Sequence, residues 1–326
     1  MAATTTYTFM HRESQMLEEF LARTRPFALT DGGIETSLIF DDAQELPHFA
    51  AFHLLGTPEG RAALERYYER HIAIARRLGV GFILESPTWR SSADWGDALG
   101  YSKPALAAAN RAAIELMGEL RDRQGTASTP MLISGCVGPR GDGYVATDLM
   151  RPEAAEAYHA EQIRVMAASG ADVITAITMT NSAEAIGIAR AARTAGKESI
   201  ISFTVETDGR LPSGETLAAA IEAVDLATSD APGYYMINCA HPTHFEATLD
   251  AGTDWTARIG GIRANASCKS HAELNAATEL DRGDATALAR HYRRLRDRLP
   301  QLKVIGGCCG TDHRHIAAIA EACLEP

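Results

Sequence analysis

This chain of 326 residues has little of what marks nucleic-acid-binding, membrane or secreted proteins. Lys and Arg number 31 against 42 Asp and Glu, the formal net charge is −11, and no run of basic residues occurs. Nucleic acids and anionic membranes require a basic face, so we expect neither as a partner. No apolar run approaches the roughly 20 residues that span a bilayer. The start, MAATTTYTFMHRES, lacks the charged and apolar regions of a signal peptide, and we expect a short lead there.

Cysteine is also scarce, with six residues in the whole chain. A long sequence without a signal peptide and with so few cysteines does not indicate a disulfide framework, so we expect the reducing cytoplasm. Thiols in that compartment serve as core fillers, metal ligands or nucleophiles. The six are Cys136, Cys239, Cys268, Cys308, Cys309 and Cys323.

Linkers rich in Pro and Ser, and blocks of charge, are absent as well, which favours one domain over 26–326 after a lead and first helix in 1–25. Apolar, β-branched runs alternate eight times with longer amphipathic runs. Such strands are typical of parallel sheets buried on both faces. Eight units in this length favour a closed (β/α)₈ TIM barrel of the α/β class over an open sheet. The expected strands are 27–33, 80–86, 131–138, 172–178, 199–207, 234–239, 259–267 and 303–309.

The first long helix is the clearest, because Thr57 is a capping residue, Pro58 suits the first turn and Gly79 suits the end. The other expected helices are 103–125, 151–170, 182–196, 213–228, 244–252, a segment within 284–299, and 313–324.

Reactive residues of such barrels lie at the C-terminal ends of the strands. Cys239 is expected to end strand six, and Cys308 and Cys309 to end strand eight, with only strand seven between them. Three thiolates and one open position form the ligand set of a catalytic zinc. The alternative is that these cysteines are small buried hydrophobes. The other strand ends carry Asp31, Gly32, Gly33, Glu85, Ser86, Gly135, Cys136, Thr178, Glu206, Asn238 and Asn265.

The loop 135–146 is rich in glycine, and Gly141-x-Gly143-x-x-Ala146 fits a relaxed dinucleotide motif. No helix is expected before about Pro152, and no P-loop occurs, so nucleotide binding is excluded. We expect a loop over the active site, with Arg140 as a candidate contact for a substrate carboxylate. No lysine lies at a strand end, which disfavours a Schiff-base aldolase.

Three motifs, DGGIET at 31–36, INCAHP at 237–242 and GGCCGTD at 306–312, resemble the homocysteine S-methyltransferase family in order and spacing. The family includes betaine– and S-methylmethionine–homocysteine methyltransferases, and the resemblance runs from residue 27 to about 320. It implies a (β/α)₈ barrel, a cytoplasmic methyltransferase of methionine biosynthesis, and Zn²⁺ held by Cys239, Cys308 and Cys309. Cys268 is a possible further ligand or an exposed loop thiol. Supporting or surface roles are expected for His241, His244, His313 and His315.

The resemblance also implies substrate contacts. Asp31, Gly32 and Gly33 would hold the amino-acid end of homocysteine, with Glu35, Thr178 and Asn238 nearby. Ile177 stands where the family usually has a Glu for the substrate ammonium. Either Glu85 or Glu206 replaces that charge, or the acceptor is not homocysteine, and both interpretations stay open. Trp89 and Trp95 are candidates to box an onium methyl donor by cation–π attraction, or else to pack over the barrel mouth.

The implied function is methyl transfer from a small onium donor, such as S-methylmethionine, to the zinc-bound thiolate of homocysteine. Zinc suits this chemistry because coordination deprotonates a thiol near neutral pH. One alternative is a divergent member that uses another acceptor or demethylates another compound. A non-enzymatic alternative is a binding protein whose zinc is structural or absent. The sequence does not name the donor or the oligomeric state.

Overall fold

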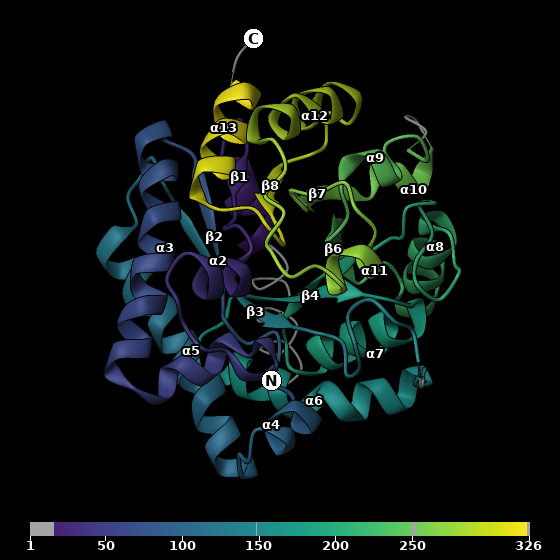
Figure 1. Ribbon diagram of the computed structural model, residues 1–326. Coiled ribbons are helices and arrows are strands. Elements are labelled where there is room, and N and C mark those ends of the chain that lie inside the picture. Colours follow the sequence, from purple (N-terminus) through teal and green to yellow (C-terminus); the bar gives the residue numbers. More distant parts are fainter. Residues whose placement is uncertain (1–15, 148, 250–252, 325–326) are drawn as a thin grey trace, which may run out of the picture.

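The computed structural model describes residues 16–147, 149–249 and 253–324 (Figure 1). Eight parallel strands form a closed barrel in chain order, and the last strand pairs with the first. This confirms the predicted (β/α)₈ barrel. The strands are β1 (Ala28–Leu29), β2 (Gly81–Glu85), β3 (Met131–Val137), β4 (Val173–Met179), β5 (Glu198–Phe203), β6 (Pro232–Asn238), β7 (Ile259–Ala264) and β8 (Val304–Gly307).

Seven long helices form the outer layer around the barrel in the described part of the chain (Figure 1). They are α3 (Pro58–Leu78), α5 (Lys103–Gln124), α6 (Pro152–Ala168), α7 (Ser182–Thr194), α8 (Leu217–Thr228), α12 (Ala285–Arg298) and α13 (His313–Leu324). A further helix covers 16–23, so the predicted first helix lies partly within the described residues, whereas the predicted lead over 1–15 lies outside them.

The predicted ends of α3 are confirmed. The Thr57 hydroxyl accepts a hydrogen bond from the Gly60 N–H at 3.1 Å, and Pro58 occupies the first turn. Gly79 ends the helix in the left-handed conformation, with φ of 64°. Glycine adopts this conformation without the steric cost that other residues meet.

The prediction of a helix over 244–252 is wrong for residues 244–249, the part of this segment that the structure describes. The chain instead forms the short α9 (Pro242–Phe245), which begins one residue after the N-cap His241 and gives way to turns. Proline favours the first turn of a helix, so the start shifts toward Pro242. Other short helices that the sequence did not indicate are α2 (Ile34–Phe40), η1 (Pro47–Phe49), η2 (Ala51–Gly56), α4 (Ala93–Ala98), α10 (Asp254–Ala257) and α11 (His271–Asn275).

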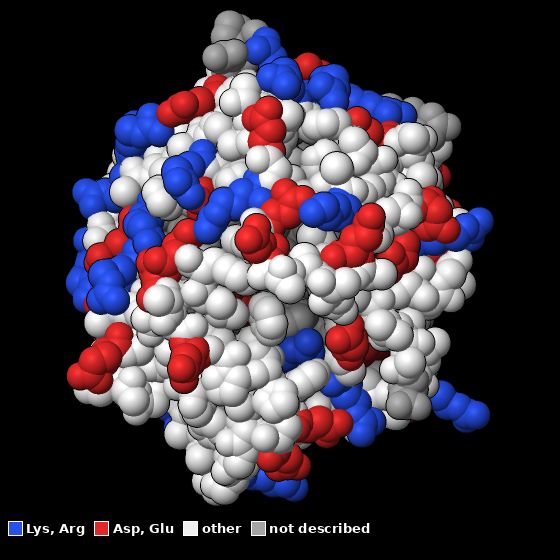
Figure 2. Space-filling view, in the orientation of Figure 1, with Lys and Arg blue, Asp and Glu red and all other residues white. Residues whose placement is uncertain are grey.

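Two apolar clusters fill the molecule. One fills the space between the strands and the helices, and the other comprises residues such as Ile83, Val173, Ile200 and Met236 from the strands of the barrel. Acidic and basic side chains are interspersed over the face in Figure 2, without a broad basic patch. Among the described residues, no helix combines the length and apolarity needed to cross a bilayer.

Candidate active site

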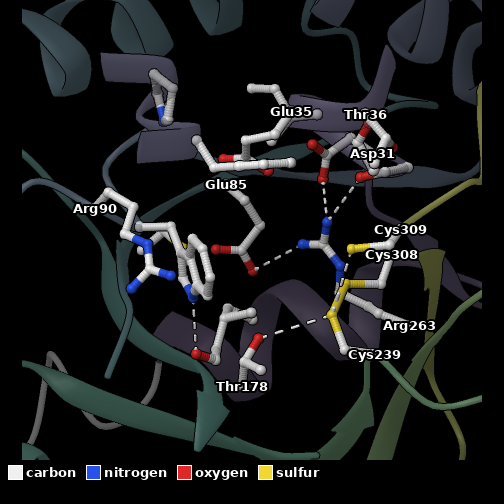
Figure 3. Close-up of a pocket in the computed structure, with 18 of the residues that line it drawn as sticks. Asp31, Glu35, Thr36, Glu85, Arg90, Thr178, Cys239, Arg263, Cys308 and Cys309 are labelled. Carbon is white, nitrogen blue, oxygen red and sulfur yellow. Dashed lines mark hydrogen bonds and ion pairs between the residues drawn. A yellow bond between two sulfur atoms is a disulfide. The ribbon is translucent and has the colours of Figure 1, made fainter. Parts of the chain in front are cut away.

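A cavity of about 310 Å³ lies at the C-terminal ends of the strands (Figure 3). The predicted residues Asp31, Gly32, Gly33, Glu85 and Thr178 line it, as do Glu35, Trp89 and Ile177. All three predicted metal ligands also line it. The side chains that Figure 3 labels come from strands, loops and helix α2, far apart in the sequence, which the barrel brings to one end.

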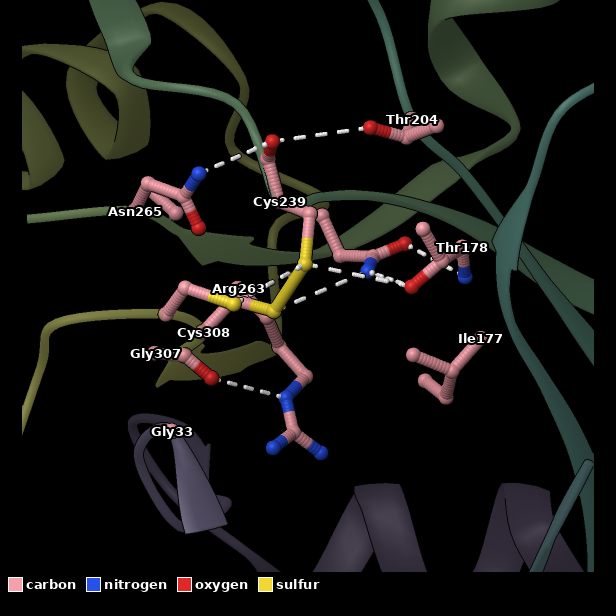
Figure 4. Close-up of a disulfide and its surroundings, with 12 residues drawn as sticks. Gly33, Ile177, Thr178, Thr204, Cys239, Arg263, Asn265, Gly307 and Cys308 are labelled. Carbon is pink, nitrogen blue, oxygen red and sulfur yellow. Dashed lines mark hydrogen bonds between the residues drawn. A yellow bond between two sulfur atoms is a disulfide. The ribbon is translucent and has the colours of Figure 1, made fainter. Parts of the chain in front are cut away.

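Cys239, Cys308 and Cys309 lie together on one side of this cavity. Their Sγ atoms are all within 4.8 Å of one another, and no other group of three metal-ligating residues this close occurs in the described segments. Cys239 and Cys308 are joined as a disulfide, with their Cα atoms 5.3 Å apart (Figure 4). The expectation of free thiols throughout is therefore wrong for this pair, because barrel closure brings the two backbones to a separation that a disulfide spans. Reduction of the pair restores three thiols.

The turn after β8 explains how adjacent cysteines serve one site. The Thr311 N–H and hydroxyl both donate to the Cys308 carbonyl, at 3.1 and 2.7 Å, and Gly310 has φ of 78°. This tight turn breaks the strand alternation that would send the two side chains to opposite faces. A glycine is required at position 33, which faces this turn, since a Cβ there would lie 2.5 Å from the Cys308 carbonyl oxygen.

Cys239 and Thr178 both have left-handed backbone conformations, with φ of 52° and 67°. Such conformations are uncommon for side chains other than glycine and asparagine, and they cluster at functional sites. The side chain of Asn238 supports them, because it accepts from the Thr178 N–H at 2.9 Å and donates to the Thr178 hydroxyl at 2.8 Å. Asn238 therefore acts behind the wall of the cavity and is not among the residues that line it.

Arg263 of β7 is the main cavity residue that the sequence analysis missed. Its guanidinium donates to the Asp31 carboxylate at 2.7 Å and lies 3.9 Å from the Glu85 carboxylate. Burial alone would lower the pKa of Arg263, but Asp31 and Glu85 together hold it above its ordinary value. An arginine within an otherwise apolar strand, IGGIRA, was the available signal.

Two carboxyl groups of the cavity titrate near neutrality. Burial raises the pKa of Glu85 to about 7, against the opposing effect of Arg263. Burial likewise raises the pKa of Glu35 to about 7. Both groups are therefore able to exchange protons close to neutral pH.

The two tryptophans do not enclose an open box. The guanidinium of Arg90 lies between them, 4.1 Å from the ring centroid of Trp89 and 3.7 Å from that of Trp95. The Trp89 indole N–H donates to the carbonyl of Ile177 at 3.1 Å, so Trp89 stays at the cavity wall. The predicted stacking on a cation thus occurs here with a cation of the protein itself.

The glycine-rich loop reaches the cavity through Tyr144. The Tyr144 hydroxyl lies 3.3 Å from the Cys309 sulfur, and its ring packs against His271 in a tilted arrangement, with centroids 4.2 Å apart. Arg140, the residue predicted to point inward, instead pairs with Asp94 at 2.7 Å.

Several other candidates lie outside the cavity. Glu206 pairs with the His271 ring at 3.0 Å and is not among the lining residues. Cys268 is exposed and does not belong to the sulfur cluster. The four histidines at 241, 244, 313 and 315 also do not line the cavity.

Crystal structures of one Escherichia coli protein share this architecture. The homocysteine methyltransferase MmuM in its oxidized form has a TM-score of 0.74 and 19% identity, over 93% of this chain and 98% of that chain. Its metallated form has a TM-score of 0.69 and 20% identity, over 91% and 96%. At these identities the likeness shows the fold. No curated protein matches this chain in sequence.

The sequence itself also matches a family. The family model described as homocysteine S-methyltransferase matches residues 28–323, which include every strand of the barrel and all three clustered cysteines. This chain therefore belongs to the homocysteine S-methyltransferase family and is a methyltransferase enzyme.

Proposed function

We propose that this protein is a zinc-dependent S-methyltransferase that transfers a methyl group from a small onium compound to a thiol such as homocysteine. The observation that carries the proposal is the meeting of three cysteine sulfurs on one side of a cavity. We also propose that residues 26–326 form one domain and that the enzyme acts in the cytoplasm, as the sequence predicts.

The three sulfurs fit zinc by number and by chemistry. Sulfur is a preferred zinc ligand, and three protein ligands leave the fourth tetrahedral position for a substrate. Bound there, zinc would lower the pKa of a substrate thiol and orient its sulfur. The reduced pair Cys239–Cys308 is a precondition, because a disulfide supplies no thiolate. One relative in this fold is described in an oxidized and in a metallated form, which supports both states here.

The residues of the chain would then supply the remaining chemistry. Glu35 and Glu85 both titrate near pH 7 and line the cavity, so either carboxylate can take the proton that the thiol loses. The partly buried indole of Trp89 and the side chain of Ile177 keep part of the wall apolar, which limits access of water. The sulfur of the acceptor then attacks the methyl group, and the onium atom of the donor loses its positive charge as the donor leaves.

A second candidate keeps the chemistry and changes the acceptor. Ile177, in place of the expected glutamate, and the salt bridge between Arg263 and Asp31 both favour an acceptor other than homocysteine. Demethylation of another methylated compound onto such an acceptor belongs to the same candidate. Membership of a methyltransferase family disfavours the non-catalytic binding protein.

The test measures zinc content and methyl transfer together. The protein is reduced with a phosphine, loaded with zinc and assayed with homocysteine against S-methylmethionine, betaine and dimethylsulfoniopropionate. We expect about one zinc per chain. Cys308→Ser should lose the zinc and the activity, whereas Cys268→Ser, at an exposed cysteine outside the cluster, should keep both. A reduced wild-type protein that binds no zinc would overturn the proposal.

A further inference from the structure

The cavity also carries information about the methyl acceptor, and this inference rests on the proposed function. Asp31 is the carboxylate of the segment expected to hold the amino-acid end of homocysteine. Both of its oxygens are already engaged, one with Arg263 at 2.7 Å and the other with the Tyr67 hydroxyl at 2.9 Å. Asp31 lines the cavity but is only 1% exposed, so a substrate ammonium would have to share its oxygens with these two partners.

The salt bridge places a fixed cation where a substrate ammonium would otherwise lie. Arg263 is 6% exposed and is also held by the carbonyl of Gly307, to which its Nε donates at 3.1 Å. The Glu85 carboxylate, the nearest alternative partner for an ammonium, faces the same guanidinium. The side chain of Ile177 adds no charge. An amino-acid acceptor would therefore bring its ammonium group beside a buried cation of the same sign.

Arg90 presents the opposite case, a cation that has no anion partner. It lines the cavity and is 8% exposed. One terminal N–H donates to the carbonyl of Gly141 at 2.9 Å, and the Nε atom has no partner within hydrogen-bond distance. No carboxylate of the described residues forms an ion pair with it, and Asp142 and Glu35 act on it only at longer range. A guanidinium that is stacked on both faces offers its edge, and this edge matches a carboxylate.

We propose that the methyl acceptor is a small thiol carboxylic acid without an amino group, whose sulfur binds at the three cysteines and whose carboxylate binds Arg90. The reaction balances without a redox partner. The acceptor thiol gives up its proton, its sulfur forms a new bond to the methyl carbon, and the bond between that carbon and the onium atom breaks. The bonding electron pair stays with the onium atom of the donor, which loses its positive charge.

The test uses four thiols that differ only in charge: homocysteine, 4-mercaptobutanoate, 3-aminopropane-1-thiol and propane-1-thiol. Homocysteine carries both charged groups, 4-mercaptobutanoate only the carboxylate, 3-aminopropane-1-thiol only the ammonium, and propane-1-thiol neither. Each is titrated into the reduced, cobalt(II)-loaded enzyme without a methyl donor. The three cysteines already give a sulfur-to-cobalt absorption band, and the change in this band on addition of the thiol reports binding. We expect 4-mercaptobutanoate to bind about tenfold more tightly than homocysteine, and the aminothiol to bind least tightly.

Tighter binding of homocysteine would overturn this inference and leave the proposed function intact, with Glu85 or Glu35 as the partner of the ammonium. No change in the absorption band with any of the four thiols would instead contradict the proposed function itself. The two failures are therefore distinguishable in one experiment.

A pair of arginine variants assigns the carboxylate. Arg90→Gln should weaken binding of 4-mercaptobutanoate about tenfold relative to propane-1-thiol, which has no carboxylate and reports whether the site is intact. Arg140→Gln is the matched control, because this exposed arginine pairs with Asp94 outside the cavity. Suppose instead that Arg90→Gln leaves acceptor binding unchanged and raises KM for dimethylsulfoniopropionate but not for trimethylsulfonium. Arg90 would then bind the carboxylate of the donor, and the acceptor assignment would be wrong.

Discussion

His71 shows how a single residue of the outer layer supports the site. It lies on α3, is 1% exposed, and its Nε2 accepts a hydrogen bond from the Gly32 N–H at 3.3 Å. Its Nδ1–H donates to the carbonyl of Tyr67 at 2.9 Å. Burial lowers the pKa of His71 to about 4, with Asp31 opposing this shift and His313 and Arg70 adding to it. Protonation of Nε2 would remove the acceptor for Gly32, next to Asp31.

The depressed pKa of His71 predicts a loss of stability in acid. The unfolded chain takes up a proton near pH 6.5, but the folded chain does so only near pH 4, so the free energy of unfolding falls as pH decreases between these values. We expect His71→Gln to be less stable than wild type at pH 7. This difference should shrink by about 2 kcal/mol at pH 4.5.

Urea unfolding of both proteins at several pH values measures the change. The comparison with the variant isolates His71, because other groups that titrate in this range, such as His241, are present in both proteins. A difference between the two proteins that does not vary with pH would contradict the prediction.

At the scale of secondary-structure elements, the C-terminal ends of the strands position the residues of the site. The C-terminal ends of β4, β6 and β8 supply Thr178, Cys239 and the cysteine pair, and each end departs from regular strand geometry through a residue with positive φ. The helices have conventional ends and maintain the wall behind these strands. Figure 4 shows Thr178, Cys239 and Cys308 converging from separate strands.

The N-cap of α3 gives a prediction at this scale. Thr57→Ala removes the acceptor for the Gly60 N–H and should lower the free energy of unfolding by about 1 kcal/mol. Thr57→Ser keeps a hydroxyl at the same place and should lose much less. Urea titration compares the three proteins. Equal losses in both variants would indicate that the cap contributes through its methyl group and not through the hydrogen bond.

Much of the fold and the sulfur cluster could be predicted because both depend on local patterns. Apolar runs identify strands, and strand order places Cys239 near Cys308 once the barrel is assumed. A charge within an apolar strand marks Arg263 as unusual, but the roles of Arg263 and Tyr144 could not be predicted, since they depend on which partners the folded chain brings to them. The disulfide was unexpected for the same reason, because sequence separation does not give the distance between two Cα atoms. The predicted helix over 244–252 was wrong because Pro242 favours an earlier helix start.

At the scale of the whole molecule, metal binding should raise the free energy of unfolding, because the proposed ligands come from two separate strands of one closed barrel. A ligand that binds only the folded state raises stability by mass action. With reduced protein, zinc at about 100 times its dissociation constant should add about 3 kcal/mol, or a Tm increase of roughly 5 °C. Differential scanning calorimetry with and without a chelator measures this shift. Cys309→Ser should show little of it, and an equal shift in that variant would place the metal elsewhere.

The strand β1 has only two residues, yet it closes the barrel by pairing Ala28 with Val304 and Leu29 with Ile305. Cys308 and Cys309 follow this closing strand directly, and the carbonyl of Cys308 touches Gly33 just beyond β1. Cys239 follows β6, and β7 alone separates β6 from β8. The three sulfurs thus lie beside the seam at which the two ends of the barrel meet, some 276 residues apart along the chain (305 − 29). Under the proposed function, a metal ion held by the three sulfurs would therefore cross-link β6 and β8 beside the pair of strands that closes the barrel.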